Sequence, residues 1–311
     1  ETDTRRRRTS RPGPARCARL MSRSPASSRR DLAPALDRLY ADFNAQESVA
    51  DPIWRVRRYH APEDQEVVAF IAAALAFGRV QSILNSIDGM LAVMGASPAN
   101  FVRAFDPSRD KAVFSHLVHR WTDGADFAAL AWILRQIVDR SGSIEHFFSE
   151  GLSPDAIDIG AALESFSTRA LALDVAAVYG RRKPKPGVAY FFSRPSSGGA
   201  CKRLNLFLRW VVRRDRVDLG LWTRVRPAQL IVPLDTHIIR VGQCLRLTKL
   251  KSPGWRMAAD ITASLRSLDP TDPIRFDFSI CHLGMMNACG FGTSRGDAQC
   301  PLTGACRPRR R

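Results

Sequence analysis

Residues 62–80, PEDQEVVAFIAAALAFGRV, decide the fold class of this chain. Pro62, Glu63 and Asp64 make a typical helix start, because proline is tolerated in the first turn and acidic side chains are favourable there. The run from Val67 to Phe77 is apolar on every face of a helix, and Gly78 ends it. A helix without a polar face is normally buried, so the sequence predicts that this one lies at the centre of the core.

Apolar residues recur at helical spacing along most of the remaining chain. Leu32, Leu36, Leu39 and Phe43 set this pattern in the first ordered segment, from Asp31 onward. Further helices are expected over 79–94, 126–140, 154–172, 199–214, 234–247, 254–268 and 272–286. Alternating β-branched runs are nearly absent, and the short apolar stretch 230–232 is limited by the proline after it. The predicted fold class is all-α.

Composition divides the chain into three parts. Residues 1–30 are rich in Arg, Ser, Pro and Gly, which predicts a disordered basic tail. Residues 31–290 are expected to form one helical domain of two lobes, with the boundary near 181–198, where two loops rich in helix-breaking residues occur. Residues 291–311 are expected to form a cysteine-containing C-terminal loop and an Arg tail.

The formal net charge of +17 is concentrated at the two ends. Ten Arg stand in 1–30 against Glu1 and Asp3, and four more stand in 307–311. Basic arms favour polyanionic partners through salt-dependent attraction, although a merely solvated tail is an equal alternative. The longest apolar run, 67–77, is far shorter than the roughly 20 residues that span a membrane. We expect a cytoplasmic protein without a membrane partner.

The segment PSSGGACKRLNLFLRWVVRRD (195–215) predicts an amphipathic helix behind a glycine turn. Lys202, Arg209 and Arg213 fall on the face opposite the apolar stripe, which predicts three cations that face away from the core.

Ser197, Gly198 and Gly199 precede this helix and permit close approach of a ligand to the backbone. Because helix N-termini favour anions, the turn is a candidate phosphate-binding site. An ordinary surface helix with a solvated Arg face would give the same pattern.

The segment LIVPLDTHIIRVGQCLRL (230–247) predicts a second helix, with Asp235 as its N-cap. The apolar run before Asp235 implies a partly buried carboxylate, close to other groups. His237 is a candidate phosphate contact, with a packed structural histidine as the alternative.

Two motifs resemble known families. GGACKRLN and PLDTHIIRV resemble the helix-hairpin-helix DNA glycosylase superfamily, and the long interval between them is nearest the archaeal 8-oxoguanine glycosylase branch. The span 31–290 also resembles an uncharacterised bacterial family known only as a domain of unknown function. Residues 195–199 depart from the Leu-Pro-Gly-x-Gly turn that is usual in the superfamily.

The glycosylase resemblance implies a two-lobed helical bundle that removes a damaged base, cleaves at an abasic site, or does both. Lys202 would attack the sugar of a flipped-out nucleotide, and Asp235 would assist. The implied partner is double-stranded DNA that is damaged or abasic, and no obligate protein partner is expected. The protein would then be associated with the nucleoid. Two alternatives remain: a non-catalytic nucleic-acid-binding protein on the same scaffold, and a helical scaffold protein with Arg-rich tails.

Four of the seven cysteines crowd near the C-terminus: Cys281, Cys289, Cys300 and Cys306. In the glycosylase superfamily many members end in an iron–sulfur loop of spacing C-x6-C-x2-C-x5-C. Here the last interval, from Cys300 to Cys306, matches this spacing, whereas the position of the second ligand is occupied by Asp297. Four cysteines suit an iron–sulfur cluster or zinc, and a loop without metal is the remaining alternative.

Overall fold

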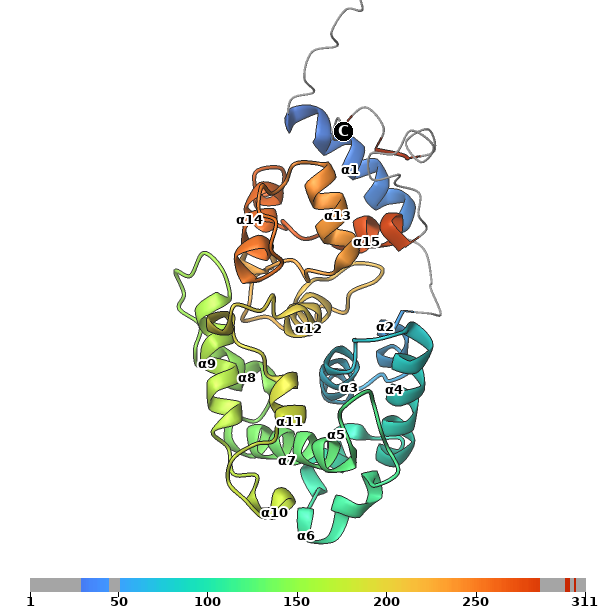
Figure 1. The fold of residues 1–311 in the computed structure, drawn as a ribbon, viewed down its shortest axis with the longest axis vertical. Coiled ribbons are helices and arrows are strands. Elements are labelled where there is room, and N and C mark those ends of the chain that lie inside the picture. The colour runs from blue at the N-terminus through green and yellow to red at the C-terminus, as the bar shows by residue number, and fades with distance from the viewer. Residues whose placement is uncertain (1–28, 45–50, 286–299, 303–304, 306–311) are drawn as a thin grey trace, which may run out of the picture.

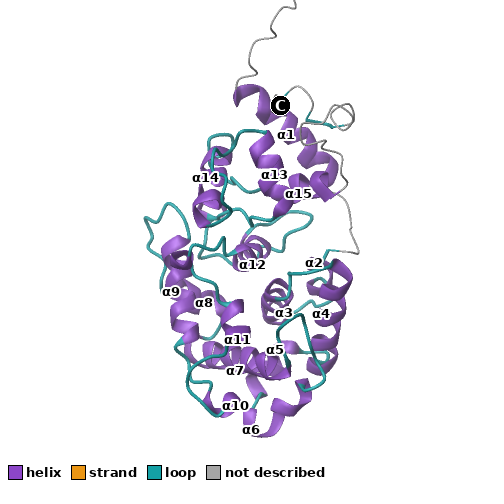
Figure 2. Cartoon of the chain, in the orientation of Figure 1, coloured by secondary structure: helices purple, strands orange, loops and turns teal. Residues whose placement is uncertain are grey.

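The computed structural model describes residues 29–44, 51–285, 300–302 and 305, and the regular secondary structure in these ranges is helical (Figure 1). Fifteen α-helices and three short 3-10 helices occur in them. Within these ranges no strand is formed, and only two isolated β-bridges appear, so helices alternate with loops (Figure 2). The all-α prediction is confirmed.

The α-helices are α1 (Arg29–Phe43), α2 (Ile53–Val56), α3 (Pro62–Ala74), α4 (Val80–Met94), α5 (Pro98–Ala104), α6 (Pro107–Asp110), α7 (Gly124–Ser141), α8 (Ile144–Ser149), α9 (Gly160–Leu171), α10 (Ala176–Tyr179), α11 (Pro186–Phe191), α12 (Lys202–Val212), α13 (Thr236–Cys244), α14 (Trp255–Arg266) and α15 (Asp277–Met285).

Helix α3 is the central helix, as its sequence predicts. It starts at Pro62, and every residue from Val67 to Ala76 is buried. Its main partner is α12, and the rings of Phe70 and Phe207 meet between them with centroids 5.1 Å apart. This packing places the N-terminal end of α12 near the loop that follows α3.

The first helix packs with the last ones. α1 lies beside α15, where Tyr40 meets Phe276 with ring centroids 6.4 Å apart and Asp37 pairs with Arg275 (Figure 1). Segments from the two ends of the described chain therefore share one part of the core. Nothing in the sequence pattern indicates this pairing, and the lobe boundary near 181–198 stays a prediction.

The remaining sequence predictions concern the short apolar stretch 230–232, the two ends of the chain and membrane-spanning segments. The stretch from Leu230 to Val232 is buried but joins no strand. The basic tail up to residue 28 and most of the C-terminal loop lie outside the described residues. Among the helices that the structure describes, none has both the length and the apolar character needed to cross a membrane.

Candidate functional site

A cavity of about 790 Å³ opens where the central helix, α12, α13 and α15 converge. Its wall is formed by the loop after α3, the turn before α12, the start of α13 and one side of α15. Lys202 and Asp235 both line it, although they belong to different helices. The structure therefore places both of the residues that the sequence identifies as catalytic candidates on the wall of one cavity.

Lys202 is the first residue of α12, and its direction is set by an unusual turn. Gly198 has φ of +80°, and Cys201, directly before the helix, has φ of +48°. A positive φ is uncommon for a residue with a side chain, so the turn before Lys202 is strained. The Lys202 amine donates to the carbonyl oxygen of Ala76, 3.5 Å away, in the loop after α3.

The glycine turn itself is exposed, and only part of it reaches the cavity. Ser197 donates from its hydroxyl to the carbonyl of Arg194, and the carbonyl of Gly198 accepts from the amide of Trp255 at 3.2 Å. Of the three predicted phosphate-binding residues, Gly199 lines the cavity while Ser197 and Gly198 lie outside its wall. The phosphate-binding role of this turn stays a prediction.

Asp235 is the N-cap of α13, as predicted. Its Oδ1 accepts hydrogen bonds from the amides of His237 at 2.8 Å and Ile238 at 2.7 Å. Its Oδ2 accepts from the thiol of Cys281 on α15, at 3.1 Å. The cap holds one edge of the carboxylate in place, while the other edge lies against the thiol in the cavity wall.

Cys281 is a neutral thiol in this setting. Burial raises the pKa of Cys281 well above its ordinary value, and the neighbouring carboxylates of Asp235 and Asp277 raise it further. Of the other candidate metal ligands, Cys300 is buried, while Cys289 and Cys306 lie outside the described residues. Among the described residues, no group of three or more His, Cys, Asp or Glu side chains is placed to hold a metal.

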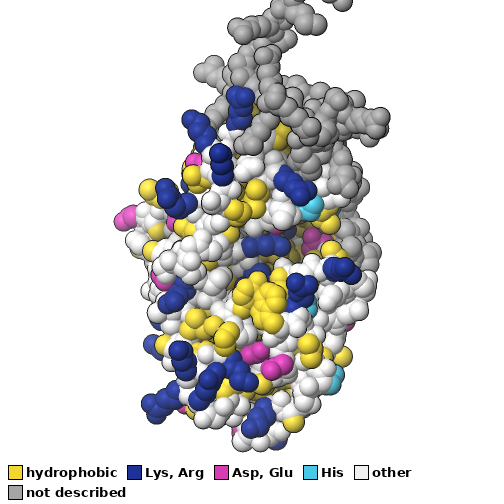
Figure 3. All heavy atoms as spheres, in the orientation of Figure 1, with side chains coloured by type: hydrophobic (Ala, Val, Ile, Leu, Met, Phe, Trp, Pro, Cys, Tyr) yellow, Lys and Arg dark blue, Asp and Glu magenta, His cyan; other side chains and the backbone are white. Residues whose placement is uncertain are grey.

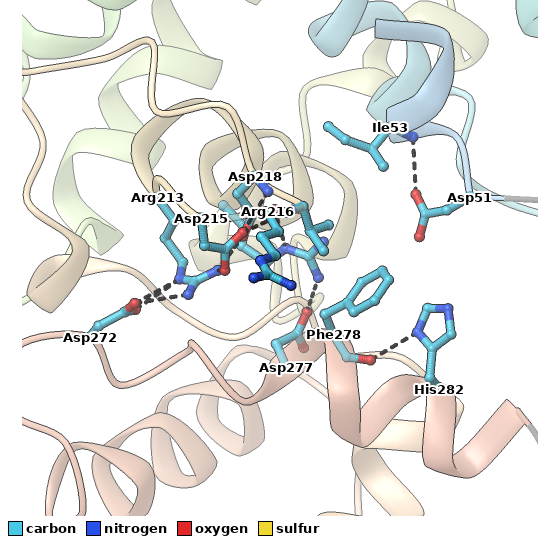
Figure 4. Close-up of polar contacts among 12 residues, drawn as sticks. Asp51, Ile53, Arg213, Asp215, Arg216, Asp218, Asp272, Asp277, Phe278 and His282 are labelled. Carbon is cyan, nitrogen blue, oxygen red and sulfur yellow. Dashed lines mark hydrogen bonds and ion pairs between the residues drawn. The ribbon is translucent and has the colours of Figure 1, made fainter. Parts of the chain in front are cut away.

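The expectation that Arg209 and Arg213 face solvent is wrong, because both guanidinium groups are buried. Arg209 pairs with Asp218, with Nε to Oδ1 of 3.2 Å, and with Asp277. Figure 4 shows Arg213 among three carboxylates: Asp215 at 3.0 Å, Asp272 at 2.9 Å, and Asp218.

This ion-pair network explains the error. Its carboxylates come from the loop after α12, the segment before α15 and the first residue of α15. Burial disfavours the charge of Arg209 and Arg213, but the carboxylates outweigh burial and raise the pKa of both. With their donors directed at carboxylates, these arginines are not available to contact DNA phosphates as predicted.

His237 lines the cavity, but its ring is packed. Its Nδ1 is buried without a hydrogen-bond partner in the described structure. A Cβ added to Gly284 would lie 2.6 Å from Cβ of His237, so α15 crosses directly over this residue. This arrangement favours the structural alternative over a phosphate contact.

Sequence reasoning missed three charged residues of the cavity wall, Asp51, Arg203 and Asp277. Burial raises the pKa of Asp277 to about 6, against the opposing effect of Arg209, and its Oδ1 has no partner in the described structure. Arg203 follows Lys202 directly in the sequence, and this adjacency was the only indication that Arg203 would lie near the candidate site.

Comparisons with known proteins identify a family, but no individual protein that resembles this chain. A family model described as "Protein of unknown function (DUF2400)" matches residues 51–286, a range that includes all the residues described as lining the cavity. No curated protein matches the chain, and no solved structure matches it. The match covers well over half of the chain, so this protein belongs to the DUF2400 family.

Proposed function

We propose that this protein is a DNA glycosylase, an abasic-site lyase, or both, acting on a nucleotide flipped out of the duplex into the cavity. The observation that carries the proposal is the convergence of the Lys202 amine and the Asp235 carboxylate on one cavity. Its volume of about 790 Å³ falls in the range of roughly 300–1,000 Å³ typical of small-molecule sites and leaves room for a nucleoside.

Lys202 is suited to be the nucleophile. Of the six lysines in the chain, all within the described ranges, it alone lines the cavity. Its amine lone pair would form a bond to the sugar C1′ while the bond from C1′ to the base breaks and its electron pair leaves with the base. The attached nitrogen then loses a proton, and its lone pair forms the C1′=N bond while the C1′–O4′ bond breaks. The electron pair of that bond stays on O4′, which takes up a proton, and the product is an iminium between Lys202 and C1′.

Asp235 is suited to assist through charge and proton transfer. Positive charge develops on the sugar as the base leaves, and a carboxylate fixed nearby stabilises it. The same carboxylate can accept the proton that the amine loses. Two backbone amides hold Oδ1, so the orientation of Asp235 depends on α13 and not on the substrate.

The scaffold is compatible with the helix-hairpin-helix type. α11 and α12 are joined by residues 192–201, which include the 3-10 helix Pro195–Ser197 and Gly198, and Lys202 begins the second helix. The exposed backbone of Ser197 and Gly199 beside this turn leaves room for a DNA phosphate. Lys and Arg side chains spread over one face of the molecule would favour the approach of DNA (Figure 3).

The proposal is tested by trapping the iminium with borohydride on duplexes that carry an abasic site or one of a panel of damaged bases. Wild-type protein should form a covalent adduct with at least one substrate, and Lys202→Ala should form none. Lys251→Ala is the matched control, because Lys251 is exposed and does not line the cavity, and it should trap as well as wild type.

Absence of any wild-type adduct, with no base released from any duplex, would overturn the proposed chemistry. Duplex binding that persists in that case, and survives Lys202→Ala, would instead identify a non-catalytic nucleic-acid-binding protein.

A further inference from the structure

Arg203 is a buried cation with no carboxylate partner in the described structure. It follows Lys202 on α12, lines the same cavity and is only 7% exposed. Among the described residues its hydrogen-bond acceptor is the carbonyl oxygen of Tyr190, and its Nε is buried without a partner there. A buried guanidinium with unused donors is costly unless something else satisfies it.

Two other buried arginines, Arg209 on α12 and Arg213 directly after its last residue, have their charge compensated. Arg209 and Arg213 each meet at least two carboxylates, and the pKa of both is raised. Burial instead lowers the pKa of Arg203 to about 10, because no carboxylate offsets it. Of these three buried arginines, Arg209 and Arg213 are thus paired with carboxylates, whereas Arg203 has no carboxylate partner among the described residues.

Aromatic rings hold the Arg203 guanidinium at the cavity. Its central carbon lies 3.4 Å from the ring centroid of Tyr190 and 5.2 Å from that of Phe77. Both rings also line the cavity. Stacking on a ring face fixes the plane of the guanidinium. Its N–H groups then point outward within that plane, which is the geometry that recognises a phosphate.

We infer that Arg203 is the anion-binding residue of the cavity and takes a phosphate of the nucleotide that is bound over Lys202. The inference rests on the proposed function for the identity of the ligand as DNA. A phosphate would supply the negative charge that the described protein does not, and its oxygens match the paired donors of a guanidinium. Because Arg203 and Lys202 are neighbours in sequence, the anchored phosphate would belong to the nucleotide under attack or to an adjacent one.

The inference is tested by binding of a duplex with a stable abasic-site analogue in which single phosphates are replaced, one at a time, by neutral methylphosphonate. For wild-type protein, one replacement near the site should weaken binding about tenfold or more, as expected for loss of a charge-assisted hydrogen bond. Arg203→Met should bind the normal duplex with similar weakness and lose nothing further at that replacement. The matched control is Arg256→Met, on an exposed position of α14, which should retain the wild-type profile.

If every replacement weakens Arg203→Met as much as it weakens wild type, Arg203 does not contact phosphate and the inference is wrong. This readout is independent of catalysis, so an inactive protein that shows the predicted coupling would support the anion site while contradicting the repair chemistry.

A second measurement uses wild-type protein without DNA. The Nε–H resonance of Arg203, assigned by its loss in Arg203→Lys, should shift when inorganic phosphate is added. The corresponding resonance of Arg209, which donates to Asp218, should not shift. A phosphate shift that chloride does not produce supports the site, and an unchanged Arg203 resonance at high phosphate overturns it.

Discussion

The thiol of Cys281 donates a hydrogen bond to Oδ2 of Asp235, with 3.1 Å between sulfur and oxygen. The bond joins α15 to the N-cap of α13 across the cavity wall. With Oδ1 bound to two amides, both oxygens of the carboxylate are engaged before any substrate arrives. A substrate that needs Oδ2 must displace only a thiol, which is a weak donor.

This bond predicts how Cys281 reacts. Burial and the charge of Asp235 raise the pKa of Cys281, so its thiolate should be scarce at pH 8. Modification by iodoacetamide, followed for each cysteine peptide by mass spectrometry, should be slow at Cys281 in wild-type protein. Asp235→Asn should accelerate it, because the neighbouring negative charge is removed. Equal rates in the two proteins would contradict the contact.

Two substitutions at Asp235 should separate its structural role from its chemical role. Asn is a good N-cap, so Asp235→Asn should keep nearly the wild-type free energy of unfolding while it forms much less borohydride-trapped adduct. Asp235→Ala loses the cap and should also lower the free energy of unfolding by about 1 kcal/mol. Denaturant unfolding checks the stability part, and an unstable Asp235→Asn would contradict it.

The cap and the central helix could be predicted because their signals are local. The N-cap pattern around Asp235 and the apolar run 67–77 each lie within a few turns of one helix. The environment of Arg209 could not be predicted, because Asp277 reaches it from a distant segment. Helical periodicity distinguishes apolar from polar faces, but it does not distinguish a solvated arginine from one buried among carboxylates.

That buried network leads to a stability prediction. Arg209→Met should lower the free energy of unfolding by about 3–5 kcal/mol, because it leaves Asp218 and Asp277 buried without their shared cation. Arg256→Met, on the exposed surface, should change it by less than about 0.5 kcal/mol. Equal effects of the two substitutions, measured by denaturant unfolding, would show that Arg209 is solvated after all.

His119 should make stability depend on pH. Burial lowers the pKa of His119, and this effect outweighs the opposing one of the Phe77 carbonyl, which lies 2.9 Å from Nε2. The other ring nitrogen, Nδ1, lies 2.9 Å from the hydroxyl of Ser86. The unfolded chain takes up the proton near pH 6.5, whereas the folded protein does so only at lower pH. The free energy of unfolding should therefore fall as pH drops below about 6.5. It should level off once the folded form is protonated too.

His119→Asn tests this dependence. The variant should be less stable near neutral pH, because it loses the ring contacts, but its stability should change less between pH 7 and pH 5. An unchanged slope in urea unfolding across that range would assign the dependence to another group.

The proposed reaction depends most on which residue supplies the nucleophile. The direct measurement is peptide mapping of the borohydride-trapped protein–DNA adduct after nuclease and protease digestion. We predict that the sugar remnant is found on the side chain of Lys202, in the peptide at the start of α12. A remnant on any other lysine, or on an N-terminal amine, would contradict the cavity as the site of the reaction.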